Sequence, residues 1–230
     1  MIIPLYVGFD PRTEIGYHTF VSSVLHTSTV PVSITPLSQS LLQTVWKAGR
    51  RDGSNDFTYL RFLIPWLQGF TGWAMFCDGS DMVLKGNLAE LWSLRDMYKA
   101  VQVVTHAYGT RHPRKYVGTA MESDNRDYPR KNWSSVMLIN CSHFSWRSLD
   151  PISVGTMEGR DLHAFEFVRK SAEIGALPVE WNWMADEMGE NKNAKLIHYT
   201  AGIPAIPHYA NSPMANDWSM AALKVNHITL

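Results

Sequence analysis

Residues 72–81 read Gly-Trp-Ala-Met-Phe-Cys-Asp-Gly-Ser-Asp, and this stretch decides the fold class. Its first half is an unbroken apolar run, which begins at a glycine and ends at an Asp-Gly pair typical of a turn. A run of this kind predicts a strand buried on both faces, as in a mainly parallel sheet that is covered by helices. The two aspartates, Asp78 and Asp81, then follow the carboxyl end of a buried strand.

Apolar segments on both sides of this strand alternate with segments of helical character. The alternation predicts an α/β/α sandwich. No repeat or linker interrupts the 230 residues, so one domain spanning residues 1–230 is expected. Pro65 is expected to kink its helix or to sit early in a turn. Strands are expected at residues 2–7, 32–35, 101–105, 136–140 and 196–200, helices after Thr13 and at residues 41–47, 58–68, 88–94 and 161–172, and a surface loop at residues 50–55.

The composition fits a soluble globular protein without a large charged surface. The 21 basic and 21 acidic residues cancel, which argues against a nucleic-acid binder acting through a strong positive field. Cys77 and Cys141 lie in apolar stretches, where two small buried hydrophobes in a reducing cytoplasm are a better interpretation than a disulfide. The first residues lack a basic leader and a cleavage site, and no apolar run is long enough to cross a bilayer. A cytoplasmic location without a transmembrane segment is therefore expected, and the oligomeric state stays open.

Asp78 and Asp81 form a candidate metal site, because ligands gather beyond the carboxyl ends of the strands in open α/β sheets. Two carboxylates suit Mg²⁺ or Mn²⁺, which would in turn bridge the phosphates of a nucleotide. His198, in the expected strand at residues 196–200, could complete this site, since imidazole suits Mn²⁺ when carboxylates accompany it. The alternatives are that the aspartates only form turn hydrogen bonds and that His198 is a core residue.

Arg61 and the pair Arg130-Lys131 are candidate partners of a diphosphate. A guanidinium can bind two phosphate oxygens at once, and an ammonium can bind them as a point charge. Arg61 lies among apolar neighbours and needs a partner if it is buried. For Arg130, a solvated surface charge is the better interpretation.

Glu180, Asn182 and the pair Asp186-Glu187 offer carboxylates and an amide for acid–base work or for binding a hydroxyl. The alternative is that this tract is the end of an amphipathic helix. The sequence contains no recognisable motif of a nucleophilic enzyme. The sequence has no Gly-x-Ser-x-Gly elbow, no Gly-rich phosphate loop ending in Lys-Ser/Thr and no Cys-x-x-Cys pair.

Five segments in register resemble the GT-A glycosyltransferases related to family 8. That group includes glycogenin and the bacterial lipopolysaccharide galactosyltransferases, and short uncharacterised bacterial and phage-borne members are closer still. The order of the segments is kept from the first strand to about Pro204. They are residues 57–65 (FTYLRFLIP), 76–84 (FCDGSDMVL) with 88–92 (LAELW), 131–140 (KNWSSVMLIN), 177–182 (LPVEWN) and 196–204 (LIHYTAGIP).

The resemblance implies a GT-A fold with a Rossmann-like nucleotide-sugar-binding part, residues 1–105, and an acceptor-binding, metal-completing part, residues 106–210. It also implies an Mn²⁺-dependent (or Mg²⁺-dependent) UDP-sugar site, often with retention of the anomeric configuration. Asp81 matches the second aspartate of the family's Asp-x-Asp motif, and His198 matches its metal-binding histidine. The remaining matches are Arg61 near the donor phosphates, Asn182 in the substrate pocket, Phe9 and Asp10 where base and ribose are held, and Tyr17 as a stacking partner.

The sequence departs from the family pattern at two places. Asp78-Gly-Ser-Asp81 is one residue longer than Asp-x-Asp, so Asp78 either reaches the metal through a bulge or does not contribute. The usual Gly-Gly-x-Pro-Trp ending is replaced by residues 201–205, Ala-Gly-Ile-Pro-Ala, without the aromatic residue. Both departures bear on the geometry of the donor site.

The main hypothesis is a metal-dependent glycosyltransferase that moves a sugar from a nucleotide diphosphate donor to a glycan or other small acceptor. Two alternatives remain: a non-catalytic nucleotide- or sugar-binding protein with a degraded metal site, and a sugar nucleotidyltransferase. The second alternative is expected to carry a Gly-rich basic loop after the first strand, and residues 8–12 are a poor version of it. The candidate site residues are Asp81, Asn182 and Glu180 as catalytic residues, Asp78, Asp81 and His198 as metal ligands, and Phe9, Asp10, Tyr17, Arg61, Asp78 and Lys131 as donor-binding residues.

Overall fold

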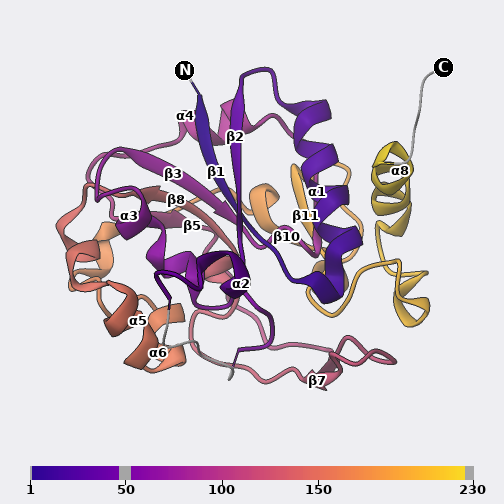
Figure 1. Cartoon of the computed structure of the whole chain (residues 1–230). Helices are drawn as coiled ribbons and strands as arrows, with labels where there is room; N and C mark the ends of the chain where they lie inside the picture. Colours follow the sequence, from indigo (N-terminus) through magenta and orange to yellow (C-terminus); the bar gives the residue numbers. More distant parts are fainter. Residues whose placement is uncertain (1, 47–52, 226–230) are drawn as a thin grey trace.

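The computed structural model describes residues 2–46 and 53–225, and within these residues a central sheet of six strands forms the middle layer (Figure 1). The strands follow the order β2-β1-β3-β8-β5-β9. All neighbouring pairs are parallel except those that involve β8, which runs antiparallel to β3 and β5. The predicted mainly parallel sheet is thus confirmed. Its strands are β1 (Ile3–Gly8), β2 (Val32–Leu37), β3 (Trp73–Cys77), β5 (Val101–Val103), β8 (Val136–Asn140) and β9 (Ile174–Ala176).

A smaller sheet lies beside the carboxyl end of β3. It joins β10 (Trp183–Met184), β11 (Leu196–His198) and β4 (Met82–Leu84), with β11 parallel to β10 and antiparallel to β4. Its register pairs His198 with Met82, the residue after Asp81. A separate two-stranded ribbon, β6 (Arg114–Lys115) with β7 (Ser123–Asp124), lies below the central sheet in the view of Figure 1.

Helices cover both faces of the central sheet, as expected for an α/β/α sandwich. In Figure 1, α1 and α8 stand together on one side, and α3, α5 and α6 lie on the other. The helices are α1 (Glu14–Thr27), α2 (Gln39–Leu42), α3 (Ile64–Leu67), α4 (Leu88–Ser93), α5 (Pro151–Thr156), α6 (Gly159–His163), α7 (Ala185–Met188) and α8 (Ala215–Val225). The short 3-10 helices are η1 (Pro11–Thr13), η2 (Leu60–Leu63), η3 (Trp133–Ser135), η4 (Phe144–Ser148), η5 (Ser171–Glu173), η6 (Val179–Asn182) and η7 (Pro207–Tyr209).

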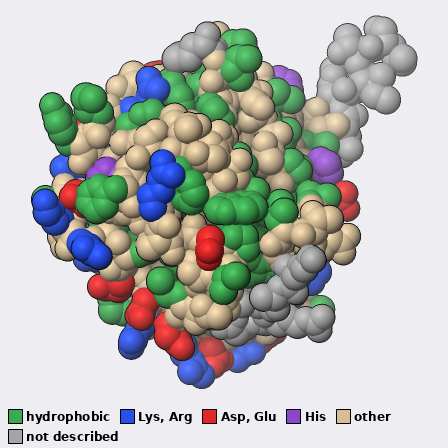
Figure 2. Space-filling model, turned by 60° about the vertical axis from the view of Figure 1, so that its left-hand side comes forward, with side chains coloured by type: hydrophobic (Ala, Val, Ile, Leu, Met, Phe, Trp, Pro, Cys, Tyr) green, Lys and Arg blue, Asp and Glu red, His purple; other side chains and the backbone are tan. Residues whose placement is uncertain are grey.

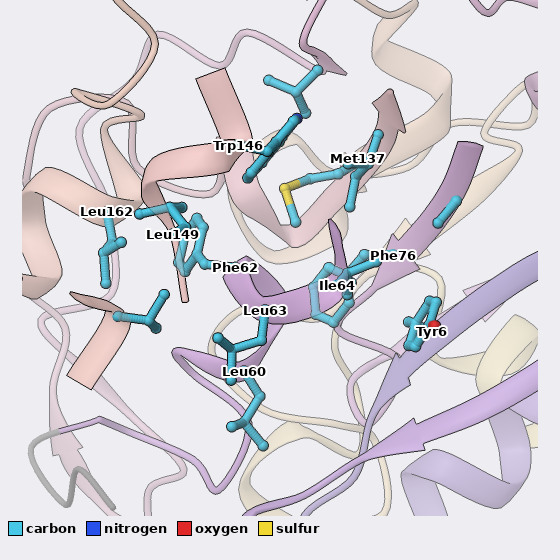
Figure 3. Packing of buried hydrophobic residues seen from close by; sticks show 14 of the residues in the cluster. Tyr6, Leu60, Phe62, Leu63, Ile64, Phe76, Met137, Trp146, Leu149 and Leu162 are labelled. Carbon is cyan, nitrogen blue, oxygen red and sulfur yellow. The ribbon is translucent and has the colours of Figure 1, made fainter. Parts of the chain in front are cut away.

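The two faces of β3 belong to different hydrophobic clusters. Ala74 and Phe76 point into the cluster that includes Phe62 and Trp146 (Figure 3), whereas Met75 and Cys77 pack on the other face of the sheet. Successive side chains alternate between the faces of a strand, so only an unbroken apolar run can fill both layers. Full burial of one such large side chain contributes about 1.5–3 kcal/mol. The two clusters hold the carboxyl end of β3 rigidly in place.

Two predicted helices are wrong in length. The segment at residues 58–68 forms η2 followed by the single turn of α3, because Pro65 has no N–H and its ring excludes a continuous α-helix through the preceding turn. The segment at residues 161–172 is α-helical only as far as His163, and the 3-10 helix η5 begins at Ser171. Phe165 then adopts a left-handed conformation with φ 56°, which ends the helix.

The helix predicted at residues 41–47 is a four-residue turn, α2, that begins earlier at Gln39. Its expected end lies outside the described residues, as does the first half of the loop predicted at residues 50–55. No helix in the described ranges combines the length and the apolar character needed to cross a bilayer.

Candidate functional site

A tight turn after β3 brings Asp78 and Asp81 to the same side of the chain. Ser80 N–H donates to Asp78 O at 2.8 Å, and Met82 N–H donates to Gly79 O at 3.2 Å. Gly79 has φ 73°, and a Cβ atom on it would lie 2.2 Å from Cγ1 of Val7. Only glycine has both the conformational freedom and the absence of a side chain that this position requires.

His198 completes an acidic cluster with the two aspartates. One candidate ligand atom from each of Asp78, Asp81 and His198 lies within 4.8 Å of the other two. The pairing of β11 with β4 provides this proximity, and Tyr199 N–H, directly after β11, donates to Asp81 O at 2.8 Å. The structure therefore places Asp78 beside the other two residues despite the longer Asp-Gly-Ser-Asp spacing.

A chain of hydrogen bonds fixes the ring of His198. Ser135 Oγ donates to Asn132 O at 2.6 Å, so it accepts from Asn182 Nδ2 at 2.8 Å. With Nδ2 used in this way, Asn182 Oδ1 faces Nδ1 of His198 at 2.9 Å and accepts a hydrogen bond from Nδ1–H. The other nitrogen, Nε2, lies 3.4 Å from Asp81 Oδ2 and therefore faces the cluster.

Arg61 is buried and forms an ion pair with Asp78. Its side chain is 4% exposed, and Nη1 lies 2.6 Å from Asp78 Oδ1. Nε donates to Thr58 O, Nη1 also donates to Ser134 O, and the guanidinium lies over the ring of Phe76 at 4.7 Å. Arg61 therefore orients Asp78 from behind.

The protonation of the cluster reflects burial and charge together. Burial raises the pKa of Asp78 to about 6, with Asp81 acting in the same direction and Arg61 in the opposite one. Burial alone would lower the pKa of His198, but the neighbouring Asp81 and Asp78 more than compensate and raise it. Each group thus depends on the charges of the others.

The cluster suits a divalent cation. Asp81 Oδ1 is buried and has no hydrogen-bond partner within the described part of the chain, and an unsatisfied buried carboxylate oxygen is costly. Two carboxylates with one neutral imidazole are a ligand set that Mn²⁺ accepts readily and Mg²⁺ accepts with added water. The residues present therefore fit the metal implied by the sequence.

A cavity of ≈ 520 Å³ opens in front of this cluster. Its size is sufficient for a nucleotide-sized or sugar-sized ligand. Its lining includes the cluster and Arg61, Lys115 and Tyr116 of the β6 region, and Glu158 and His163.

Asn182 and Glu180 do not line this cavity. The Asn182 side chain is fully buried and touches His198 instead of the open space, which makes it a positioning residue in this arrangement. Glu180 lies in η6, where its backbone carbonyl accepts from Lys195 N–H. Of the three catalytic candidates, Asp81 is thus the one that lines the cavity.

Phe9, Asp10 and Tyr17 cluster at the carboxyl end of β1, outside the walls of the cavity. The rings of Phe9 and Tyr17 contact each other edge to face at 5.1 Å between centroids. Asp10 accepts from Arg12 and from Asp56 N–H at 3.0 Å. Burial would raise the pKa of Asp10, but these hydrogen bonds outweigh it and lower the pKa.

Lys131 lines a second cavity of ≈ 500 Å³, whose wall it shares with Lys115 and Thr200. Lys131 Nζ is held by Asn125 Oδ1 at 2.9 Å and by Asp127 Oδ1 at 3.2 Å. Two residues with a clear place in the site, Ser135 and Lys115, were not predicted. Ser135 lay in a segment that was already singled out, but Lys115 stands in a polar stretch without periodicity and gave no signal.

Comparison with known proteins gives one relative in sequence and several in structure. No family model matches the chain. Protein CDI of Arabidopsis thaliana is 34% identical over 222 residues, which cover 93% of this chain and 83% of that protein.

The solved structures that resemble the chain are glycosyltransferases. The galactosyltransferase LgtC, in complex with donor and acceptor sugar analogues, has a TM-score of 0.62 at 12% identity and covers 99% of this chain and 98% of its own. The bifunctional glycosyltransferase WbbM also has a TM-score of 0.62, at 15% identity over 96% of this chain, which spans about half (51%) of WbbM. GlyE of Streptococcus pneumoniae TIGR4 has a TM-score of 0.60 at 11% identity, over 98% of this chain and 62% of GlyE. At such identities the likeness establishes the GT-A fold, while the activity has to be argued from the site.

Proposed function

The chain belongs to the family of Protein CDI, and from its GT-A fold and its acidic cluster we propose that it is a metal-dependent glycosyltransferase. It would move a sugar from a nucleoside diphosphate sugar to a hydroxyl group of a glycan or other small acceptor. The observation that carries this proposal is the cluster of Asp78, Asp81 and His198 at the carboxyl end of β3, facing a cavity. The sequence resemblance further favours UDP as the nucleotide and retention of the anomeric configuration.

Asp78, Asp81 and His198 would hold Mn²⁺ or Mg²⁺. When bound, such an ion supplies positive charge that stabilises negative charge on the diphosphate. The surrounding residues prepare these ligands: Arg61 orients Asp78, and Asn182 keeps the proton of His198 on Nδ1 so that Nε2 is available. The protein thus contributes a fixed ligand set.

The reaction needs no covalent bond to the protein. The oxygen of the acceptor hydroxyl forms a bond to the anomeric carbon while the bond between that carbon and the diphosphate oxygen breaks. The electron pair of the broken bond stays on the diphosphate, and the hydroxyl proton passes to the departing diphosphate or to solvent. Positioning and electrostatic stabilisation are then the main catalytic effects.

The nucleotide base would lie toward the carboxyl end of β1. Asp10 holds the backbone of Asp56, and the neighbouring Asn55 and Thr58 line the cavity. Phe9 and Tyr17 lie next to Asp10 and offer aromatic rings for stacking. This placement is part of the proposal.

Calorimetric titration of UDP tests the proposal directly. UDP is expected to bind in the presence of Mn²⁺, to lose binding in EDTA, and to bind far more weakly to Asp81→Asn and His198→Ala. Glu166→Gln is the matched control, because it removes an exposed carboxylate away from the cavity and should bind UDP as the wild type does.

Turnover with a panel of UDP-sugars then separates the candidate functions. Hydrolysis or transfer of one sugar supports the glycosyltransferase. Metal-dependent binding without turnover of any sugar would favour the non-catalytic binding protein, and failure to bind any nucleoside diphosphate would refute the proposed donor. The nucleotidyltransferase alternative has little support, since β1 runs into Gly8-Phe-Asp10 and η1 without a Gly-rich basic loop.

A further inference from the structure

Lys115, the last residue of β6, stands where two cavities meet. It lines the cavity of ≈ 520 Å³ in front of the acidic cluster and also the adjoining cavity of ≈ 500 Å³. Asn132 and Thr200 are shared by both walls in the same way. Lys115 is half-buried at this junction.

Lys115 differs from the other lysine and arginine side chains that line these cavities. Across residues 2–46 and 53–225, each of the others forms an ion pair with a carboxylate, whereas Lys115 has none. Its Nζ lies 5.7 Å from the centroid of the Tyr116 ring. The pairs are Arg61 with Asp78, Arg126 with Asp124, Lys131 with Asp127 and Arg160 with Asp161.

The surroundings of Lys115 favour an anion beside it. Burial lowers the pKa of Lys115, although the charges of Asp81 and Asp78 act in the opposite direction. A partly dehydrated ammonium without a contacting carboxylate gains most when a ligand supplies the missing negative charge. The face of the molecule in Figure 2 has acidic and basic side chains mixed along its lower edge.

The backbone directly after Lys115 is hydrogen-bonded to residues that follow His198 in the chain. Tyr116 N–H donates to Ala201 O at 2.7 Å, and Val117 N–H donates to the hydroxyl of Tyr209 at 3.1 Å. Tyr116 has φ 56°, a conformation that a bulky residue adopts only when its surroundings enforce it. These bonds tie the residues that follow Lys115 to the stretch of chain just after His198 and to η7.

Resting on the proposed function, the geometry points to Lys115 as a catalytic residue that binds the diphosphate of the donor and stabilises its negative charge as the sugar leaves. Arg61 is less available for this role, because its Nη1 is paired with Asp78 and also bonds Ser134 O, and its Nε bonds Thr58 O. Lys131, the lysine expected from the sequence, is held by Asn125 and Asp127. Among the described cations that line the two cavities, Lys115 can pair with an entering diphosphate without giving up an existing ion pair.

Binding of UDP, UMP and Mn²⁺ alone to Lys115→Met, Lys115→Arg and wild type tests this role by calorimetry. Lys115→Met should weaken UDP binding in Mn²⁺ by about 10- to 100-fold, the usual effect of losing a charge-assisted hydrogen bond. UMP lacks the second phosphate, so its affinity should fall less. Lys115→Arg should retain most of the UDP affinity. Lys192→Met, which removes an exposed lysine elsewhere, serves as the matched control.

The affinity for Mn²⁺ alone distinguishes ligand binding from a structural role. Removal of a cation near two carboxylates should leave Mn²⁺ binding unchanged or make it tighter. A parallel loss of Mn²⁺ and UDP binding in Lys115→Met would mean that Lys115 only supports the fold and would overturn the inference. Equal UDP affinities of Lys115→Met and wild type would overturn it as well, while leaving the proposed function intact. Absence of UDP binding to the wild type would overturn both.

Discussion

Asn182 Oδ1 lies 2.9 Å from Nδ1 of His198, and both side chains are almost completely enclosed, with exposures of 0% and 2%. Because Asn182 Nδ2 is already donating to Ser135 and to Asn132 O, the amide cannot turn round without losing two hydrogen bonds. The pair therefore fixes which nitrogen of His198 faces the carboxylates. This relationship defines the site more closely than the acidic residues do by themselves.

Loss of Asn182 should weaken metal binding although Asn182 is not a ligand. Asn182→Ala frees the His198 ring and is expected to lower the affinity for Mn²⁺ by about 10- to 100-fold, as removal of such orienting partners does elsewhere. Ser135→Ala should have a smaller effect, since Asn132 O still accepts from Asn182. Calorimetry with Mn²⁺ measures both. Exposed Asn193→Ala is the control, and an unchanged affinity in Asn182→Ala would contradict the orienting role.

Gly79 should tolerate no side chain. Gly79→Ala combines the strain of φ 73° with a clash against Val7, and we expect a loss of about 2–5 kcal/mol in the free energy of unfolding. Gly69→Ala is the matched control, because Gly69 has φ 59° in the turn after α3 with no atom within 4 Å of the added Cβ. It should lose only about 1–2 kcal/mol. Urea unfolding measures the two values, and equal losses would mean that the contact with Val7 relaxes.

Arg61 and Asp78 should be energetically coupled. Arg61→Met leaves the Asp78 carboxylate without its cation in a nearly closed site and should cost about 3–5 kcal/mol of unfolding free energy. In the double variant Arg61→Met/Asp78→Asn the unpaired charge is gone, so part of that loss should return. A double-mutant cycle from urea unfolding without metal gives the coupling. Additive effects of the two substitutions would contradict the ion pair.

Asp10 should stabilise the fold only above acidic pH. Its pKa in the folded protein is lower than the ordinary value of 3.8, so the folded state favours the charged form. This contribution is present above the unfolded-state pKa and is lost as the pH falls through the lower folded-state pKa. Wild type should therefore exceed Asp10→Asn in urea stability at pH 6, with the difference shrinking toward pH 3. A difference that does not depend on pH would point to lost packing instead of lost charge.

The sequence was informative where an element depends on its own residues. Residues 136–140 form β8 with the predicted bounds, and the helix expected at residues 88–94 is α4, since Asn87 caps it with its own side chain. The apolar pattern predicted the wrong helix length where a helix ends inside an apolar stretch. Apolar spacing alone does not register the exclusion by Pro65 or the left-handed turn at Phe165, because both depend on how the chain packs after the turn.

By itself, the sequence determined the mainly parallel sheet, the α/β/α layers and the three residues Asp78, Asp81 and His198 as a candidate site. The sheet and the layers follow from local composition, since an unbroken apolar run of strand length is typical of the middle of such a sandwich. The three candidate residues follow from their side-chain chemistry and from the family resemblance. Only the tertiary structure decided that β11 pairs with β4 and brings His198 to Asp81, that Asn182 stands behind His198, and that Lys115 opens into both cavities. Distances between residues far apart in the chain are set by strand register and by the packing of whole layers, which no short stretch of sequence specifies.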